Sequence, residues 1–186
     1  MKSLVTSYKK DGKVLEIYFD PYPQNPREWD NLGIMVCFHR RYSLGDSHPY
    51  KASDFNSWEE VKRAIERDND VAVILPVYMY DHSGITLSTT PFSCPWDSGQ
   101  VGWIYTTKQK LRKEYDIKYV TKKIKEKAYK TLMEEVRIYS EYVEGNVFGY
   151  ILKDESGREL DSCWGFYGTD FNTNGIAEYV GFELVS

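Results

Sequence analysis

The chain lacks the hallmarks of a membrane, secreted or disulfide-stapled protein. Its longest apolar run, Val71–Tyr80, is ten residues long and includes a proline, about half of what a membrane-spanning helix needs. Met1–Gly12 is polar and has no apolar segment of the secretory type. The three cysteines (Cys37, Cys94, Cys163) are odd in number and have no CxxC spacing, which favours reduced thiols. We therefore expect a cytoplasmic protein with no membrane partner.

Motifs for cofactors, metals and phosphates are missing as well. The glycines around Gln100 lack the GxxxxGK[ST] and GxGxxG spacings, and no carboxylate pair has the context of a glycosidase. No histidine lies in an HxH, HExxH or paired-cysteine arrangement, so spacing favours no zinc site. We expect no cofactor and no metal. A metal site built from histidines and aspartates stays open as an alternative, and its candidate ligands are His39, His48, His82, Asp46, Asp54 and Asp81.

Length and patterning predict one α+β domain, residues 1–186, with a mainly antiparallel or mixed sheet and three helices. The chain has 186 residues with 41% hydrophobic and 28% charged residues, which are ordinary globular values. Its turns connect neighbouring strands, a pattern typical of antiparallel pairing. The aromatic share of 16% is high, which suits either a recognition surface or a half-buried sheet rich in tyrosine.

Local signals place the individual elements. Asp11-Gly12 predicts the turn of a hairpin over Lys2–Asp20, and Ser57-Trp58-Glu59-Glu60 predicts a capping box. Apolar residues with a 3.6-residue period predict the longest helix. The predicted strands are Gly33–Arg40, Val71–Tyr80, Ile85–Thr90, Val101–Tyr105, Val147–Lys153, Glu159–Tyr167 and Glu178–Val185. The predicted helices are Ser57–Asp68, Lys108–Tyr115 and Lys122–Val143.

Positive charge is concentrated in one segment of an acidic chain. Residues 108–130 carry ten Lys or Arg against three acids, although the whole chain has a formal net charge of −4. On a helical projection Lys123, Lys127 and Lys130 fall with Arg137 within an arc of about 80°. Such a face can contact phosphates; a solvated helix face is the alternative. The predicted binding residues are Lys122, Lys123, Lys127, Lys130, Arg137, Arg112 and Lys113, with Lys108 and Lys110 in the same cluster.

Two loop-like stretches are rich in Trp, His, Asp and Gly. Asn25–Asp46 and Tyr80–Tyr105 hold two of the three histidines and three of the five tryptophans. Because cores consist mainly of aliphatic residues, this composition indicates a shared recognition surface. The alternative is that the tryptophans cap the core and the polar residues satisfy turns. The predicted recognition residues are Arg27, Trp29, Asp81, His82, Trp96, Asp97 and Gln100.

An enzymatic alternative uses residues of the second stretch. Cys94 follows His82 by twelve residues and precedes Asp97 by three, so a thiol, a base and a carboxylate are available. No strand–turn–helix context marks Cys94 as a nucleophile, and most free cysteines are small buried residues. A small hydrolase or modifying enzyme therefore remains a second hypothesis.

Three phrases carry a family resemblance: NPREWDNLGIMVCFHRRYSLGD, YDHSGITLSTTPFSCPWDSGQVGWIY and DSCWGFYG. They resemble those of a family of small, uncharacterised proteins of bacteriophages and bacterial mobile elements, over about residues 13–168. The resemblance implies a bacterial cytoplasm and carries over no catalytic residue. Small accessory proteins in that setting include anti-CRISPR and anti-restriction inhibitors.

These observations combine into one functional hypothesis. We expect a phage or mobile-element accessory protein that acts by binding, as an inhibitor of a bacterial nucleic-acid-dependent defence complex. The first candidate for that complex is a CRISPR nuclease. The expected partner is a defence nucleoprotein or nucleic acid, which the basic helix face and the Trp/Asp/Gln loop would contact. A structural or regulatory phage protein that oligomerises is a third hypothesis.

Overall fold

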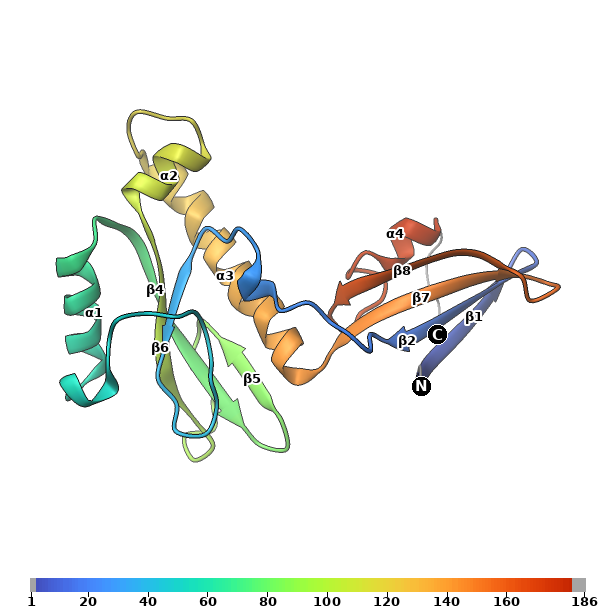
Figure 1. Ribbon diagram of the computed structural model, residues 1–186, viewed down its shortest axis with the longest axis horizontal. Coiled ribbons are helices and arrows are strands. Elements are labelled where there is room, and N and C mark those ends of the chain that lie inside the picture. Colours follow the sequence, from blue (N-terminus) through green and yellow to red (C-terminus); the bar gives the residue numbers. More distant parts are fainter. Residues whose placement is uncertain (1–2, 182–186) are drawn as a thin grey trace. The chain divides into compact units, whose positions relative to one another are not determined.

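The computed structural model describes residues 3–181, which fall into two compact units. The terminal unit consists of Met1–Asn25 and Glu141–Ser186, and the central unit consists of Pro26–Ser140. Each unit contains one four-stranded antiparallel sheet (Figure 1). The predicted α+β class with antiparallel strands and three longer helices is confirmed. The grouping of residues 1–186 into a single domain stays a prediction.

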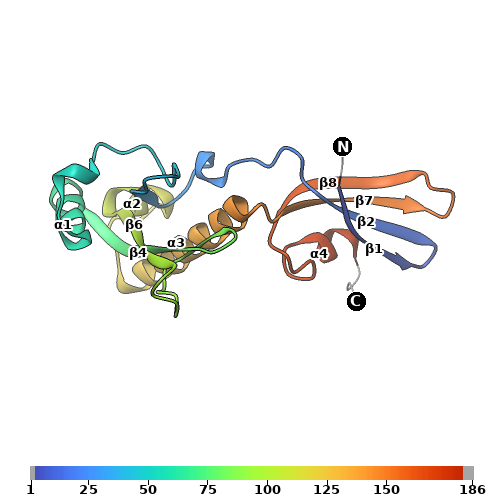
Figure 2. The same cartoon turned by 90° about the horizontal axis from the view of Figure 1, so that it is seen from below.

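The terminal unit is a sheet of order β1-β2-β7-β8 with a short helix, α4, against one face (Figure 2). The elements are β1 (Leu4–Lys10), β2 (Lys13–Phe19), β7 (Val147–Asp154), β8 (Glu159–Tyr167) and α4 (Ile176–Val180). Its core includes Leu15, Ile17, Phe148, Tyr150 and Ile176. The first hairpin is confirmed, since Asp11 and Gly12 have φ of 49° and 73°, as a two-residue turn with positive φ at both positions requires.

The central unit is a sheet of order β3-β6-β4-β5 between helices. Its strands are β3 (Ile34–Cys37), β4 (Val71–Asp81), β5 (Ile85–Ser88) and β6 (Ser98–Thr107). Its helices are α1 (Trp58–Asp68), α2 (Lys108–Glu114) and α3 (Lys122–Glu144), with 3₁₀ turns η1 (Pro26–Glu28) and η2 (Ala52–Asp54). α3 continues by four residues into the terminal unit.

Helices cover both faces of the central sheet (Figure 1). Val61 and Ile65 of α1 pack on Trp103 of β6, whereas Leu111 of α2 and Ala128 of α3 pack on the opposite side.

The α1 cap is confirmed in part, because the Ser57 hydroxyl accepts from Glu60 N–H at 3.3 Å. The Glu60 carboxylate accepts from Asn56 N–H instead of Ser57 N–H. The predicted reciprocal box is therefore shifted by one residue.

The predicted last strand, Glu178–Val185, is wrong where the structure describes it. Residues 178–180 belong to α4, and residues 182–185 lie outside the described part of the chain. Ile176 is buried, and Val180 packs against the same core four residues later, which is helical spacing. Gly181 ends the helix with φ of 76°.

None of the helices within residues 3–181 has the length and apolar character to span a membrane.

Candidate functional site

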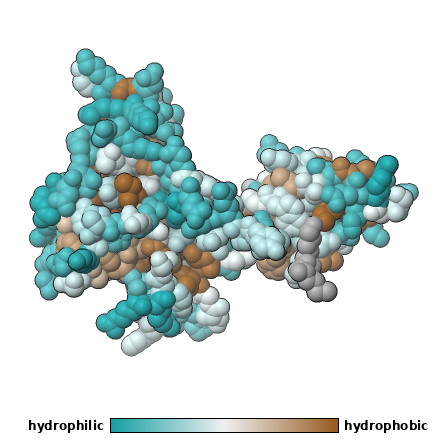
Figure 3. All heavy atoms as spheres, viewed as in Figure 1, coloured by the Kyte–Doolittle hydropathy of each residue, from teal (hydrophilic) through white to brown (hydrophobic). Residues whose placement is uncertain are grey.

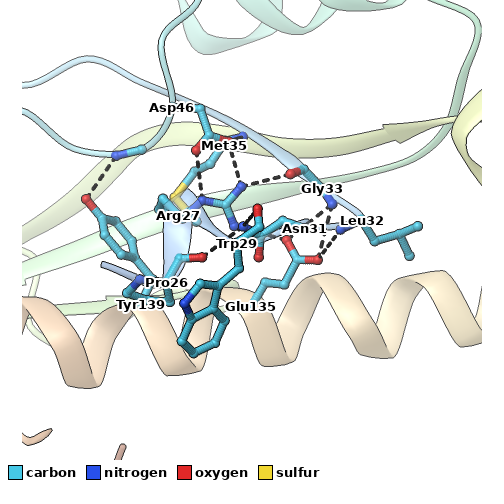
Figure 4. A network of polar contacts seen from close by, with 11 residues as sticks. Pro26, Arg27, Trp29, Asn31, Leu32, Gly33, Met35, Asp46, Glu135 and Tyr139 are labelled. Carbon is cyan, nitrogen blue, oxygen red and sulfur yellow. Dashed lines mark hydrogen bonds and ion pairs between the residues drawn. The ribbon is translucent and has the colours of Figure 1, made fainter. Parts of the chain in front are cut away.

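A buried ion-pair network positions α3 against the sheet (Figure 4). Arg27, the middle residue of η1, donates to both oxygens of Asp46 at 2.9 and 2.6 Å and to Glu135 of α3 at 3.0 Å. The same guanidinium donates to the carbonyl of Gly33 at 2.8 Å. Its side chain is 4% exposed. One side chain therefore joins three segments that are far apart in the sequence.

The two carboxylates of this network also accept backbone hydrogen bonds. Asp46 accepts from Met35 N–H at 2.7 Å, and Glu135 accepts from Leu32 N–H at 2.7 Å. Burial opposes the charge on Arg27, but its hydrogen bonds to Asp46 and Glu135 leave its pKa above the ordinary value. Burial raises the pKa of Glu135, and the Arg27 hydrogen bond opposes that rise. Each charge thus depends on its partners to remain inside the protein.

The network gives Arg27 a structural role. Arg27 was predicted as a recognition residue, but its guanidinium is buried and fully engaged, so it is not presented to a partner. The polar character of Asn25–Asp46 is explained in large part by this scaffold. One feature of the sequence indicates this buried network. Glu135 falls within the apolar stripe of α3, next to Val136 and between the turns of Leu132 and Tyr139.

Six cations form the basic surface, which is the strongest candidate site of the chain. They lie on the last turn of α2 and the first half of α3, and all six are exposed. Within residues 3–181, no carboxylate lies within 4.0 Å of any of them. Hydrophilic residues cover the α2 end of the unit in Figure 3. The basic surface consists of Arg112, Lys113, Lys122, Lys123, Lys127 and Lys130.

The start of α3 is unusual because its positive charges lie at the positive end of the helix dipole. Its first turn contains lysines and no acidic residue, whereas acids are the residues that stabilise this end, by about 0.3–1 kcal/mol each. Thr121 supplies only a long cap, with Ile124 N–H donating to its hydroxyl at 3.4 Å. These lysines lower the stability of the helix at its N-terminus. A binding role explains their position better than solvation alone.

Two tyrosines, one exposed and one partly buried, accompany these cations. Tyr119, in the loop between α2 and α3, is 71% exposed, and the Lys118 ammonium lies 5.4 Å from the centre of its ring. The Lys127 ammonium lies 5.6 Å from the ring centre of Tyr115. A basic surface with exposed aromatic rings is the combination that single-stranded nucleic acids bind, through phosphate contacts and base stacking.

Some of the predicted cations do not belong to this surface. Arg137 pairs with Glu134 of the same helix at 2.6 Å, and Lys108 and Lys110 pair with Asp70 and Asp30 at 2.6 and 2.7 Å. A paired cation contributes little net positive potential. The sequence could not show the last two pairs, since the acids come from other segments of the chain.

The predicted recognition residues divide into two groups. Trp29 lies beside α3, next to the Arg27 network (Figure 4). Asp81, His82, Trp96 and Asp97 lie where β4 ends and β6 begins. There Asp81 pairs with Arg41, Asp81 N–H donates to the Asp97 carbonyl at 2.8 Å, and Trp96 is 92% exposed. Gln100 donates to the Gly102 carbonyl at 3.1 Å and so supports its own strand.

The residues of the enzymatic alternative do come together. The Asp97 carboxylate lies 3.3 Å from His82 Nδ1 and 3.9 Å from Cys94 Sγ. The carboxylate, however, stands between the other two, and in the described residues no hydrogen bond joins Cys94 to His82. An activated thiol needs its base at the sulfur. His82 and Asp97 are also solvent-exposed, so the cluster lacks a water-excluding pocket.

Cys37 is the thiol with a strongly altered environment. It lies at the end of β3, and burial raises its pKa to about 12. The described residues contain no group of three or more His, Cys, Asp or Glu side chains that could hold a metal ion. The candidate ligands His48 and Asp46 are occupied elsewhere: His48 Nε2 contacts the Cys37 carbonyl at 3.2 Å, and Asp46 binds Arg27.

We expect Cys37 to be the slowest-labelled thiol in the folded protein. At pH 8 a thiol of pKa about 12 has roughly 10⁻⁴ of its population as thiolate, against about a quarter for an ordinary thiol. Alkylation of Cys37 by iodoacetamide should be on the order of a thousandfold slower than that of a free thiol peptide. Peptide mass spectrometry over time gives the rate. Equal labelling of folded and urea-unfolded Cys37 would contradict this placement.

Comparison with protein-family models, curated proteins and solved structures finds no match for this chain.

Proposed function

We propose that this protein binds nucleic acid, free or within a nucleoprotein complex, through the basic surface. One observation carries the proposal: six exposed cations, which have no carboxylate partner among residues 3–181, lie on two consecutive helices of a chain whose formal net charge is −4. Random solvation distributes charges of both signs, whereas phosphate binding requires cations that are not already neutralised. Exposed Tyr119, in the loop between the two helices, adds a stacking surface.

A more specific hypothesis concerns the biological target. The resemblance to small proteins of phages and mobile elements supports inhibition of a bacterial nucleic-acid-dependent defence complex, of the CRISPR type, in the host cytoplasm. In that function the basic surface contacts the guide or target strand, or competes with it. Trp96, which lies where β4 ends and β6 begins, then makes apolar contact with the protein part of the target, because an exposed tryptophan is a frequent interface anchor.

Charge reversal at Lys123 and Lys127 should weaken this binding. We expect the double variant Lys123→Glu/Lys127→Glu to bind a fluorescein-labelled 20-nucleotide RNA or DNA at least tenfold more weakly at 100 mM salt. The slope of log affinity against log salt should fall by about 1.4–1.8, since each lost phosphate contact removes about 0.7–0.9. Fluorescence anisotropy over a salt series provides both quantities.

A matched control reverses two cations four residues apart on another helix. Arg63→Glu/Arg67→Glu changes the net charge equally, on α1, and should leave affinity and salt slope nearly unchanged. If both double variants weaken binding alike, the effect is one of net charge and the basic surface is not a site. If the unaltered protein binds neither oligonucleotide, direct nucleic-acid contact is wrong.

A further inference from the structure

The first half of β4 has an open edge. β4 pairs with β6 from Val71 to Tyr80, but β5 pairs with it only from Tyr78 to Asp81. Along Val71–Val77, the edge of β4 opposite β6 therefore has no strand beside it within residues 3–181. An unpaired strand edge presents main-chain donors and acceptors that another extended chain can use.

An apolar groove lies next to this open edge. It has a volume of about 670 Å³ and is lined by Ala72, Val73 and Ile74 of β4 and by Tyr129 and Met133 of α3. Tyr129 and Met133 are 46% and 38% exposed, although both are large apolar side chains. The groove is thus a place where an apolar segment would remove considerable surface from water.

The rim of the groove is positively charged. Lys122, Lys125 and Lys130 lie around it with one acid, Glu126, so the rim has a net charge of +2. The groove adjoins the basic surface, with which it shares Lys122 and Lys130. Its floor, however, is apolar and runs along a strand, whereas the phosphate backbone of a nucleic acid requires polar contacts. The positive rim therefore favours acidic side chains in a ligand, and the apolar floor favours apolar side chains in the same ligand.

We propose that this groove binds an extended segment of a partner protein, which carries both apolar and acidic residues, as an added strand on the open edge of β4. Main-chain hydrogen bonds to β4 would provide affinity, the apolar side chains would contact Tyr129 and Met133, and the acidic ones would meet the lysines of the rim. The proposal does not depend on the proposed nucleic-acid binding.

Pro76 limits the length and register of the added strand. It has no N–H, and a proline within a sheet is tolerated where its nitrogen faces away from the paired strand. In β4 the Pro76 nitrogen therefore faces the open edge, away from β6. Residues two apart on a strand direct their N–H and C=O groups to the same side, so those of Ile74 also face the open edge. The partner segment accordingly pairs around Ile74 and ends before Pro76, which makes a short site of about four to five residues, or roughly 15 Å of strand.

A random library of 12-residue displayed peptides tests the proposal directly. Selection on the full chain should enrich peptides that combine apolar and acidic residues. The variant Met133→Glu should bind the selected peptide at least tenfold more weakly, because it places a carboxylate in the apolar floor. The matched variant Leu160→Glu, at an exposed position of β8, should leave its affinity unchanged. Equal affinity of the two variants would overturn the proposal.

Backbone methylation distinguishes strand addition from side-chain docking. Two versions of the selected peptide, N-methylated at alternate residues in the two possible frames, have the same side chains. Strand pairing predicts that one frame loses binding at least tenfold and the other retains it. Equal binding of both frames contradicts main-chain pairing.

Two other occupants give different results. If β4 edges pair with each other, light scattering will show a dimer that Met133→Glu dissociates, and the groove is then a self-association site. If the groove binds nucleic acid, Met133→Glu will weaken oligonucleotide binding and a 20-nucleotide RNA will displace the selected peptide. Either result replaces the proposal. Loss of oligonucleotide binding only in Lys123→Glu/Lys127→Glu keeps the two sites separate.

Discussion

Replacement of Arg27 by methionine should lower the free energy of unfolding of the central unit by about 3–5 kcal/mol, the usual cost of removing one member of a buried ion-pair network. Methionine has a similar length and fills most of the space. It leaves Asp46 and Glu135 buried without their cation, although both still accept backbone hydrogen bonds. The loss should therefore be electrostatic more than steric.

Urea unfolding followed by tryptophan fluorescence provides the measurement, and Arg67→Met provides the control. Arg67 pairs with its neighbour Asp68 on the surface of α1, and such pairs contribute about 0–1 kcal/mol. The triple variant Arg27→Met/Asp46→Asn/Glu135→Gln should recover part of the loss, because it removes the uncompensated charges. If Arg27→Met costs no more than Arg67→Met, the network does not hold the fold together.

Local sequence patterns predicted most of the helices and strands, because turns, helix caps and apolar periods depend on residues that are close in the sequence. Asp11-Gly12 has the positive φ that its turn requires, and the Thr107 hydroxyl accepts from Lys110 N–H at 3.1 Å at the start of α2. The apolar period of α3 has its buried residues at the predicted positions, among them Ala128, Leu132 and Val136. Strand ends were less well predicted: β3 is Ile34–Cys37 rather than Gly33–Arg40.

The division into two sheets could not be predicted from local pattern. β2 pairs with β7, more than a hundred residues later, and periodicity does not indicate which strands will pair. The same limit applies to charge. Lys110 pairs with Asp30 from eighty residues away, and Arg27 pairs with Glu135 across 108 residues. Ion pairs of this kind decide which predicted cations remain available at a site.

The candidate site was predictable where it depends on one helix. Lys123, Lys127 and Lys130 are exposed as their helical spacing predicts. Arg137 is exposed too, but its pair with Glu134, three residues before it, reduces its contribution. The groove beside β4 was not predictable, because it depends on where β5 stops pairing and on how α3 packs across the strand.

Close contact between a glycine and a tryptophan shapes the sheet of the terminal unit. Gly149 of β7 pairs with Trp164 of β8, and a Cβ atom at Gly149 would overlap the Trp164 ring and lie 2.8 Å from the Cys163 carbonyl. The Trp164 ring thus covers the glycine backbone. This gives the DSCWGFYG phrase of residues 161–168 a structural role in strand pairing.

Gly149→Ala should therefore destabilise the terminal unit by about 2–3 kcal/mol, at the upper end of the range for overpacking, because both a side chain and a carbonyl must move. Thermal unfolding followed by circular dichroism and the fluorescence of Trp164 provides the measurement. Gly157→Ala is a useful reference: apart from its chain neighbours, no described residue lies within 4 Å of a Cβ at this position, and its φ of 83° makes its cost one of backbone strain alone.

A double-mutant cycle separates the two sources of the Gly149→Ala effect. In a Trp164→Ala background the ring is gone and only the Cys163 carbonyl remains close, so the added methyl group should cost at least 1 kcal/mol less than in the unaltered chain. That coupling energy measures the contact between ring and glycine. Additive effects would show that Trp164 does not restrict this position, and the phrase would then require an explanation other than strand pairing.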